Sequence, residues 1–187
     1  MKWFDDYYNQ REFRKFAVEY DVFPVIYGRI LIANFAPEGS GRIKIGKNVT
    51  INSGLEANPV GGVRTVLLFK NKGALIEIGD STGISNAMIA AYEHVFIGKN
   101  VSIGAGVKIM DTDFHPINLE ERIQNINIPH RPVRIEDGAF IGTEAMILKG
   151  VTIGAESVIG AGSIVAKSVP PGEIWAGNPA KFIKKLK

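Results

Sequence analysis

One aliphatic position in every six residues dominates the second half of the chain, from residue 97 to residue 169. In the clearest copies an Ile is followed directly by Gly and, four positions after the Ile, by a small or β-branched residue. Such copies begin at Ile97, Ile103, Ile141, Ile153 and Ile159. A period of six matches neither the 3.6-residue period of an amphipathic helix nor the strict alternation of a half-exposed strand. The pattern therefore predicts a coil built from short strands.

The six-residue unit predicts a three-sided parallel β-helix. Each unit supplies one short strand whose Ile or Val points toward the coil axis, while Gly, Asn or Asp takes the backbone angles of the corner. Three units close one turn of about 18 residues, and stacked turns bury a continuous aliphatic column. The short strands of an ordinary sandwich are the alternative, but a spacing of six held over so many units argues against them. The expected fold class is all-β, a left-handed parallel β-helix.

Before residue 97 the repeat is less regular, and we divide the single domain into regions on this basis. We expect an N-terminal cap region at 1–42, a β-helix at 43–170 with a protruding loop at 111–132, and a short C-terminal segment at 171–187. Phe13, Phe16 and Tyr20 fall at helical spacing, and Pro24 would end that helix. We expect the helix to cover the open end of the coil, where core and sheet edge are otherwise exposed. A helix lying on a membrane surface is the alternative.

Composition and charge exclude several classes of protein. The 187 residues are 45% hydrophobic and 22% charged, and no apolar run approaches the roughly 20 residues of a membrane helix. The absence of cysteine removes disulfides and thiolate nucleophiles, and the first twenty residues show no signal sequence, so we expect a cytoplasmic protein. The net charge of +3 is mild and no nucleic-acid-binding motif accompanies it. We expect neither a membrane span nor a nucleic-acid partner.

The main interruption of the repeat runs from Asp111 to Pro132, and Asp113-Phe114-His115-Pro116 lies at its root. A regular coil does not need a loop of this length, and long ordered insertions are more often functional than decorative. An imidazole with a pKa of about 6.5 can accept a proton and return it, which suits a general base. His115 is therefore the candidate catalytic residue. A surface histidine ordered by loop packing is the alternative.

Three features together resemble the hexapeptide-repeat acyltransferases, in particular the galactoside, maltose and streptogramin O-acetyltransferases and those of surface-polysaccharide clusters. The features are the repeat, the Asp-Phe-His-Pro root of the loop, and the closing Ile-Trp-Ala-Gly-Asn-Pro-Ala-Lys at 174–181. The resemblance covers residues 75–187 well and residues 1–74 loosely. It implies a homotrimer with active sites in the grooves between neighbouring coils. It also implies direct acetyl transfer from acetyl-coenzyme A to an acceptor hydroxyl, with His115 as the general base.

The resemblance further implies which residues approach the acceptor. Asn86 matches an asparagine that helps to hold the acceptor hydroxyl near the histidine, and an asparagine filling a coil corner is the alternative. Asp111 and Asp113 could orient the imidazole or contact a sugar, although aspartates also favour turns. The implied acceptor is a hydroxyl of a sugar or glycan precursor. Amino-sugar N-acetylation and streptogramin-type O-acetylation are the alternatives.

For acetyl-coenzyme A the resemblance implies contacts along the last coils, with small or apolar residues near the pantetheine arm and lysines near the phosphates and adenine. Phe140 stands where several relatives carry Trp, which removes an indole donor but leaves apolar contact. A lysine provides a point charge for a phosphate, and a solvated basic tail is the alternative interpretation. The residues concerned are Phe140, Gly142, Ala161, Lys167, Lys181 and Lys184.

Two further functions are alternatives. A γ-class carbonic anhydrase shares the coil and the trimer but binds zinc through three histidines, and this chain has three, His94, His115 and His130. Their separations of 21 and 15 residues lack the short motif that holds two ligands of that family close together. Zinc needs ligands that converge at about 2.0–2.1 Å, so we expect no metal. A non-catalytic trimeric scaffold would explain the repeat but not the histidine loop or the closing segment.

Overall fold

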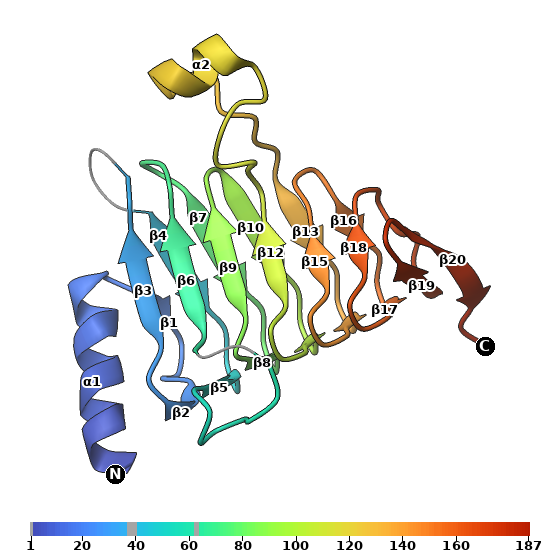
Figure 1. Cartoon of the computed structure of the whole chain (residues 1–187). Coiled ribbons are helices and arrows are strands. Elements are labelled where there is room, and N and C mark those ends of the chain that lie inside the picture. Colours follow the sequence, from blue (N-terminus) through green and yellow to red (C-terminus); the bar gives the residue numbers. More distant parts are fainter. Residues whose placement is uncertain (1, 37–40, 62–63) are drawn as a thin grey trace.

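The computed structural model describes residues 2–36, 41–61 and 64–187, which form a three-sided parallel β-helix with a helix against its N-terminal end (Figure 1). Strands β1 to β18 pass through three sheets in turn. Sheet A has the order β1-β4-β7-β10-β13-β16, sheet B the order β2-β5-β8-β11-β14-β17-β19-β20, and sheet C the order β3-β6-β9-β12-β15-β18. Neighbouring strands are parallel except for β19 and β20, which form an antiparallel hairpin. The expected all-β coil is confirmed.

The strands are short, as a six-residue unit requires. Sheet A contains β1 (Glu19–Tyr20), β4 (Arg42–Ile45), β7 (Leu75–Ile78), β10 (His94–Ile97), β13 (Val133–Ile135) and β16 (Thr152–Ile153). Sheet B contains β2 (Val25–Gly28), β5 (Thr50–Ser53), β8 (Gly83–Ser85), β11 (Ser102–Ile103), β14 (Phe140–Ile141), β17 (Val158–Ile159), β19 (Glu173–Gly177) and β20 (Ala180–Lys185). Sheet C contains β3 (Leu31–Asn34), β6 (Val66–Phe69), β9 (Met88–Ala91), β12 (Lys108–Met110), β15 (Met146–Ile147) and β18 (Ile164–Val165).

The corners of successive coils stack into columns, and two of these columns border sheet C. The B–C edge, where sheet B leads into sheet C, comprises residues 29–30, 54–61, 86–87, 104–107, 142–145 and 160–163. The C–A edge, where sheet C leads into sheet A, comprises residues 35–36, 70–74, 92–93, 111–132, 148–151 and 166–168. Backbone hydrogen bonds connect each corner to the next, as from Gly106 N to Asn86 O at 3.2 Å.

Aliphatic side chains of the repeat stack in register inside the coil. In sheet A the column consists of Ile45, Ile78, Ile97, Ile135 and Ile153, each at most 3% exposed. Burial of one such side chain contributes about 1.5–3 kcal/mol. Because side chains alternate along a strand, the strand residue that precedes each Ile points outward.

Helix α1 (Lys2–Lys15) covers the first coil, as expected for a cap (Figure 1). Phe13 is 1% exposed and enters the core. The buried Asn9 side chain donates to the backbone oxygen of Gly28 at 2.8 Å and accepts from the backbone N–H of Ile30 at 3.2 Å. The helix is thus fixed to the coil by one apolar and one polar anchor. No described helix is long and apolar enough to cross a membrane.

The expected boundaries of the first region need correction. The helix ends at Lys15, because Ala17 adopts a left-handed φ of +46°, and Tyr20 lies in strand β1 rather than in the helix. Strands β1, β2 and β3 already occupy all three sheets, so the coil begins at Glu19 and not at residue 43. Residues 1 and 37–40 of the expected cap region lie outside the described residues. The C-terminal segment 171–187 carries the hairpin β19–β20, whose first strand continues sheet B.

Candidate functional site

The long loop at residues 111–132, here called the arm, projects from the C–A edge and carries helix α2 (Leu119–Gln124) (Figure 1). Its two ends are tied together at the coil. The N–H of Arg131 donates to the carbonyl of Asp111 at 2.8 Å, and the N–H of Asp113 donates to the carbonyl of Pro129 at 3.0 Å. The arm therefore leaves the coil as a closed unit with a fixed root.

His115 lies near the root of the arm with an exposed side chain. Among the residues that the structure describes, its imidazole has no hydrogen-bond partner. The preceding residue, Phe114, has a φ of +62°, which is rare for a bulky side chain, and its N–H donates to Thr112 Oγ1 at 3.2 Å. Such strained backbone persists where the surroundings fix it, commonly at functional sites. The structure thus presents a free imidazole on a constrained backbone.

Asp113 ties the root of the arm to the next coil. Both of its carboxylate oxygens lie 2.6 Å from Lys149 Nζ, and the two side chains are 31% and 30% exposed. The carboxylate therefore faces along the C–A edge toward the β15–β16 corner. Lys149 was missed by the sequence analysis, because nothing in the repeat distinguishes it from other corner residues.

Asp111 is completely buried and orders the adjacent corner. Its carboxylate accepts hydrogen bonds from the backbone N–H groups of Tyr92, Glu93 and His94, at 2.6, 2.7 and 2.8 Å. Burial raises the pKa of Asp111 above its ordinary value, although the three backbone donors act in the opposite direction. In this structure the carboxylate orders the corner at residues 92–94, and a contact with the acceptor or the imidazole stays a prediction.

Asn86 is 2% exposed and lies in a left-handed corner with a φ of +42°. Its amide donates to the carbonyls of Asn58 and Gly61, at 2.7 and 3.0 Å, and accepts from Gly54 N–H at 2.8 Å. All three bonds hold the loop that begins at Gly54. Asn86 therefore shapes the B–C edge, and its expected contact with an acceptor stays a prediction.

Two of the expected cofactor lysines line one cleft. Lys167 and Lys181 border a cleft of about 280 Å³ between the C–A edge of the last coil and the β19–β20 hairpin. Trp175 and Phe182 add aromatic walls, and the sequence analysis gave neither a role. Lys184 is exposed on β20, pairs with Ile174 and does not line this cleft. A cleft with two ammonium groups and two rings suits a phosphate-bearing ligand with an aromatic base.

The other expected cofactor residues lie on sheet B and the B–C edge. Phe140 is 48% exposed on β14 and offers a free apolar face. Gly142 is buried, and a Cβ there would lie 2.6 Å from the backbone nitrogen of Ala161, so its small size serves the stacking of coils. Ala161 itself is exposed at the corner. Of these three, Phe140 and Ala161 are accessible to a ligand.

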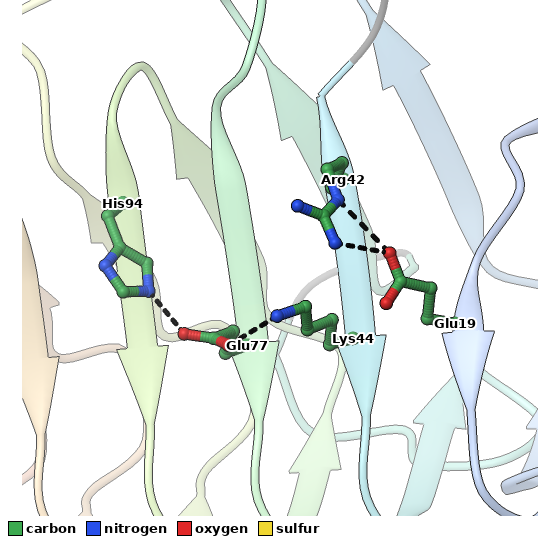
Figure 2. Close-up of polar contacts among 5 residues, drawn as sticks. All are labelled: Glu19, Arg42, Lys44, Glu77 and His94. Atoms are coloured by element: carbon green, nitrogen blue, oxygen red, sulfur yellow. Dashed lines mark hydrogen bonds and ion pairs between the residues drawn. The ribbon is translucent and has the colours of Figure 1, made fainter.

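The three histidines lie apart in environments of their own. On the outer face of sheet A, His94 Nε2 is 2.7 Å from Glu77 Oε2, and Lys44 Nζ is 3.3 Å from Glu77 Oε1 (Figure 2). The ring of His130 stacks on Tyr92 with a centroid separation of 4.4 Å. Across the described part of the chain, no group of three His, Asp or Glu side chains is arranged to hold a metal ion.

Comparison with known proteins confirms the resemblance predicted from the sequence. Residues 132–167 match the family model of the hexapeptide repeat of succinyl-transferase. Galactoside O-acetyltransferase of Escherichia coli K12 is 42% identical over 92 residues, covering 49% of this chain and 44% of the relative. The chain carries the hexapeptide repeat and resembles the acyltransferases built on it.

Solved structures extend this likeness to the fold. A hexapeptide-repeat acetyltransferase of Vibrio cholerae, solved with acetyl-coenzyme A, is 36% identical with a TM-score of 0.56 over 60% of this chain and 61% of that one. A maltose O-acetyltransferase of Clostridium difficile 630 is 26% identical with a TM-score of 0.62, covering 98% of this chain and 78% of that one. The expected left-handed β-helix is confirmed.

The chain matches only part of its curated relatives, and these relatives include enzymes of two kinds. The chain spans about half the length of the curated relatives that it matches first, at 44% and 58% of their residues. The mitochondrial gamma carbonic anhydrase 2 of Arabidopsis thaliana is also 34% identical over 102 residues, covering 46% of this chain and 37% of that protein. The repeat alone is therefore shared by two kinds of enzyme, and the residues of the arm must separate them.

The Glu77 ion pair gives a pH-dependent prediction. Burial raises the pKa of Glu77, but hydrogen bonds from His94 and Lys44 outweigh it and leave the pKa below 4.5. A lowered pKa contributes stability above pH 4.5 that is lost as the pH falls through the folded-state value. At pH 7 Glu77→Gln should therefore lower the free energy of unfolding by about 0.5–1 kcal/mol, since the pair is partly exposed.

Thermal unfolding at several pH values measures this difference. The gap between wild type and Glu77→Gln should close in acid, where the carboxylate is protonated. Glu120→Gln, at an exposed position of the arm, is the matched control and should change little at any pH. A gap that stays constant from pH 7 into acid would contradict the ion-pair account.

Proposed function

We propose that this protein is an acetyltransferase that moves the acetyl group of acetyl-coenzyme A to a hydroxyl of a sugar or glycan precursor. The observation that carries the proposal is the free imidazole of His115, held near the root of the arm by a strained Phe114 and the Asp113–Lys149 ion pair. The likeness to galactoside and maltose O-acetyltransferases supports the acceptor class.

The chemistry needs one base and one bound thioester. His115 accepts the proton of the acceptor hydroxyl while its oxygen bonds to the thioester carbon. The carbon–sulfur bond then breaks, and the imidazolium returns the proton to the departing thiolate. We propose that transfer is direct, as the resemblance implies, and the chain has no cysteine that could form a thioester of its own. A positioned base contributes about 10²–10⁴-fold to the rate, and Lys167 and Lys181 hold the phosphates of coenzyme A.

The outer face of sheet C supports the proposal of a homotrimer. Its inward residues fill the core, so the alternating positions point outward. In the single chain most of these outward side chains are apolar and only partly covered, namely Val66, Leu68, Met88, Met110, Met146 and Ile164. Lys108 is a charged exception between Met88 and Met146, and its Nζ lies 3.4 Å from Glu144 Oε2. The outer face of sheet A instead carries ion pairs such as Lys44–Glu77 (Figure 2). An apolar outer face of this kind marks a protein–protein interface, and we assign it to further copies of this chain.

Trimer formation would assemble the active site from two copies. Sheet C is bordered on one side by the C–A edge, with His115 and Lys167, and on the other by the B–C edge, with Ala161. In a closed ring of copies, one side of the sheet C face on each copy packs against the opposite side of that face on its neighbour. The C–A edge of one copy then lies beside the B–C edge of the next, and the groove between them takes acetyl-coenzyme A.

Replacing the proposed base tests the catalytic assignment. His115→Ala should slow acetyl transfer at least about 10²-fold, because the acceptor loses its proton acceptor. The variant should still bind acetyl-coenzyme A in calorimetry, since the cofactor cleft does not include His115. His94→Ala removes a histidine from the outer face of sheet A and should retain turnover. Near-normal turnover in His115→Ala would overturn the assignment.

A charge on the apolar face tests the trimer. Met88→Lys places an ammonium at an outward position of sheet C, which a monomer tolerates but a packed interface does not. Sedimentation velocity should show a trimer for the wild type and a monomer of 20.4 kDa for the variant. Ser102→Lys, at an exposed outward position of sheet B, should stay trimeric. A wild-type monomer, or a trimer unaffected by Met88→Lys, would contradict the interface.

A further inference from the structure

A lysine lies between two aromatic rings beside the proposed base. The Nζ of Lys70 is 5.9 Å from the ring centroid of Phe114 and 5.9 Å from that of Phe35. Lys70 and Phe35 belong to corners of the C–A edge below the arm, and Phe114 is the residue directly before His115. We call Phe35, Lys70 and Phe114 the Lys70 cluster. The Lys70 ammonium thus lies near the ring of Phe114, the residue that directly precedes the proposed base His115.

Lys70 differs from four lysines of the coil that pair with acidic side chains. Lys44, Lys99, Lys108 and Lys149 each lie within 4.0 Å of a carboxylate. Within the described ranges, Lys70 has no such carboxylate and instead faces the two rings. Cation–π attraction at an accessible site is worth about 0.5–1 kcal/mol and leaves the three N–H donors of the ammonium available to an anion.

The two aromatic rings of the cluster provide an apolar surface on which a sugar ring can pack. Phe35 is 61% exposed, and Phe114 is held in place by its hydrogen bond to Thr112. An accessible aromatic face offers apolar surface to the C–H groups of a sugar ring, and the partly buried ammonium of Lys70 offers a point charge to phosphate or carboxylate. The rings and the ammonium together fit a ligand that has both a sugar ring and an anionic group.

We propose that the Lys70 cluster binds an anionic group of the acceptor, so that the natural acceptor is a sugar bearing phosphate or carboxylate rather than a neutral glycoside. This inference rests on the proposed function and specifies its substrate class. The anion contacts Lys70 while the sugar ring packs on Phe114, which leaves a hydroxyl of that ring beside His115.

Matched acceptors test the proposal through acetyl-coenzyme A consumption. Glucose and galactose are compared with their 1-phosphates, their uronic acids and their UDP derivatives, which separates phosphate, carboxylate and nucleotide as sources of the charge. At least one anionic class should have a kcat/KM about tenfold or more above the neutral sugar, as expected for a charge-assisted contact. Added salt should reduce this advantage, because the contact is accessible to solvent.

Variants of the Lys70 cluster distinguish a role in binding the acceptor from a role in supporting the structure around His115. Lys70→Met should raise the KM for the anionic acceptor about tenfold and leave kcat and the kinetics of neutral sugars unchanged. Lys70→Arg should retain most of the advantage. Lys72→Met removes an exposed lysine from the same corner and is the matched control. Equal kcat/KM for neutral and anionic sugars, or an equal loss of kcat for both in Lys70→Met, would overturn the proposal.

A binding measurement keeps the inference distinct from the proposed function. His115→Ala can be titrated calorimetrically with glucose 1-phosphate, UDP-glucose, glucuronate and glucose, with and without the additional Lys70→Met change. Tighter binding of an anionic sugar that disappears without Lys70 would support the cluster even if no sugar were acetylated, a result that would overturn the proposed function alone. Equal binding of all four ligands would overturn the cluster alone.

Discussion

The in-register stacking of one Ile or Val from every six residues is the constraint on which the rest of this structure depends. The column from Ile45 to Ile153 is almost fully buried, and each member pairs with its counterpart one coil away. Because the unit length is fixed by that column, corners of successive coils fall directly above one another. The coil therefore has straight edges, on which side chains distant in sequence lie side by side.

Most of the residues proposed for the chemistry therefore lie on the edges of the coil. An insertion at a corner leaves the strands before and after it in register, so the arm can project at Asp111 and the coil resume at Val133. The stacking also explains why Lys149 reaches Asp113 and why Lys70 approaches Phe114, since these residues occupy nearby corners of one column. The largely apolar face of sheet C lies between the two edges, so the proposed association through that face would bring them together.

Local sequence predicted the parts of this structure that repeat or that interrupt the repeat. The coil, the arm and the position of His115 follow from spacing alone or from the motif at the root of the arm. The first coil could not be predicted from spacing, because β1 to β3 lack the Ile-Gly unit. Only alternating residues such as Ile26 and Ile32 mark the buried side of these strands.

Contacts between distant residues were beyond the same approach. The partners of Asp111 are backbone N–H groups at residues 92–94, and those of Asn86 lie in the loop at 54–61. A polar residue in a coil corner has the same local sequence whether it binds a substrate or orders a neighbouring corner. Only the packed chain shows which neighbouring corners these two side chains hold, and that Lys149 and Lys70 lie beside the arm.

In the proposed trimer, one active site takes its C–A edge from one copy and its B–C edge from the next. Mixing two inactive variants, His115→Ala and Ala161→Glu, in refolded trimers tests it directly. Ala161 is exposed, so the added carboxylate blocks the cofactor groove without disturbing the core. Random mixing should restore about a quarter of the wild-type sites, because intact edges then meet across some interfaces. Mixed trimers without activity would contradict the account.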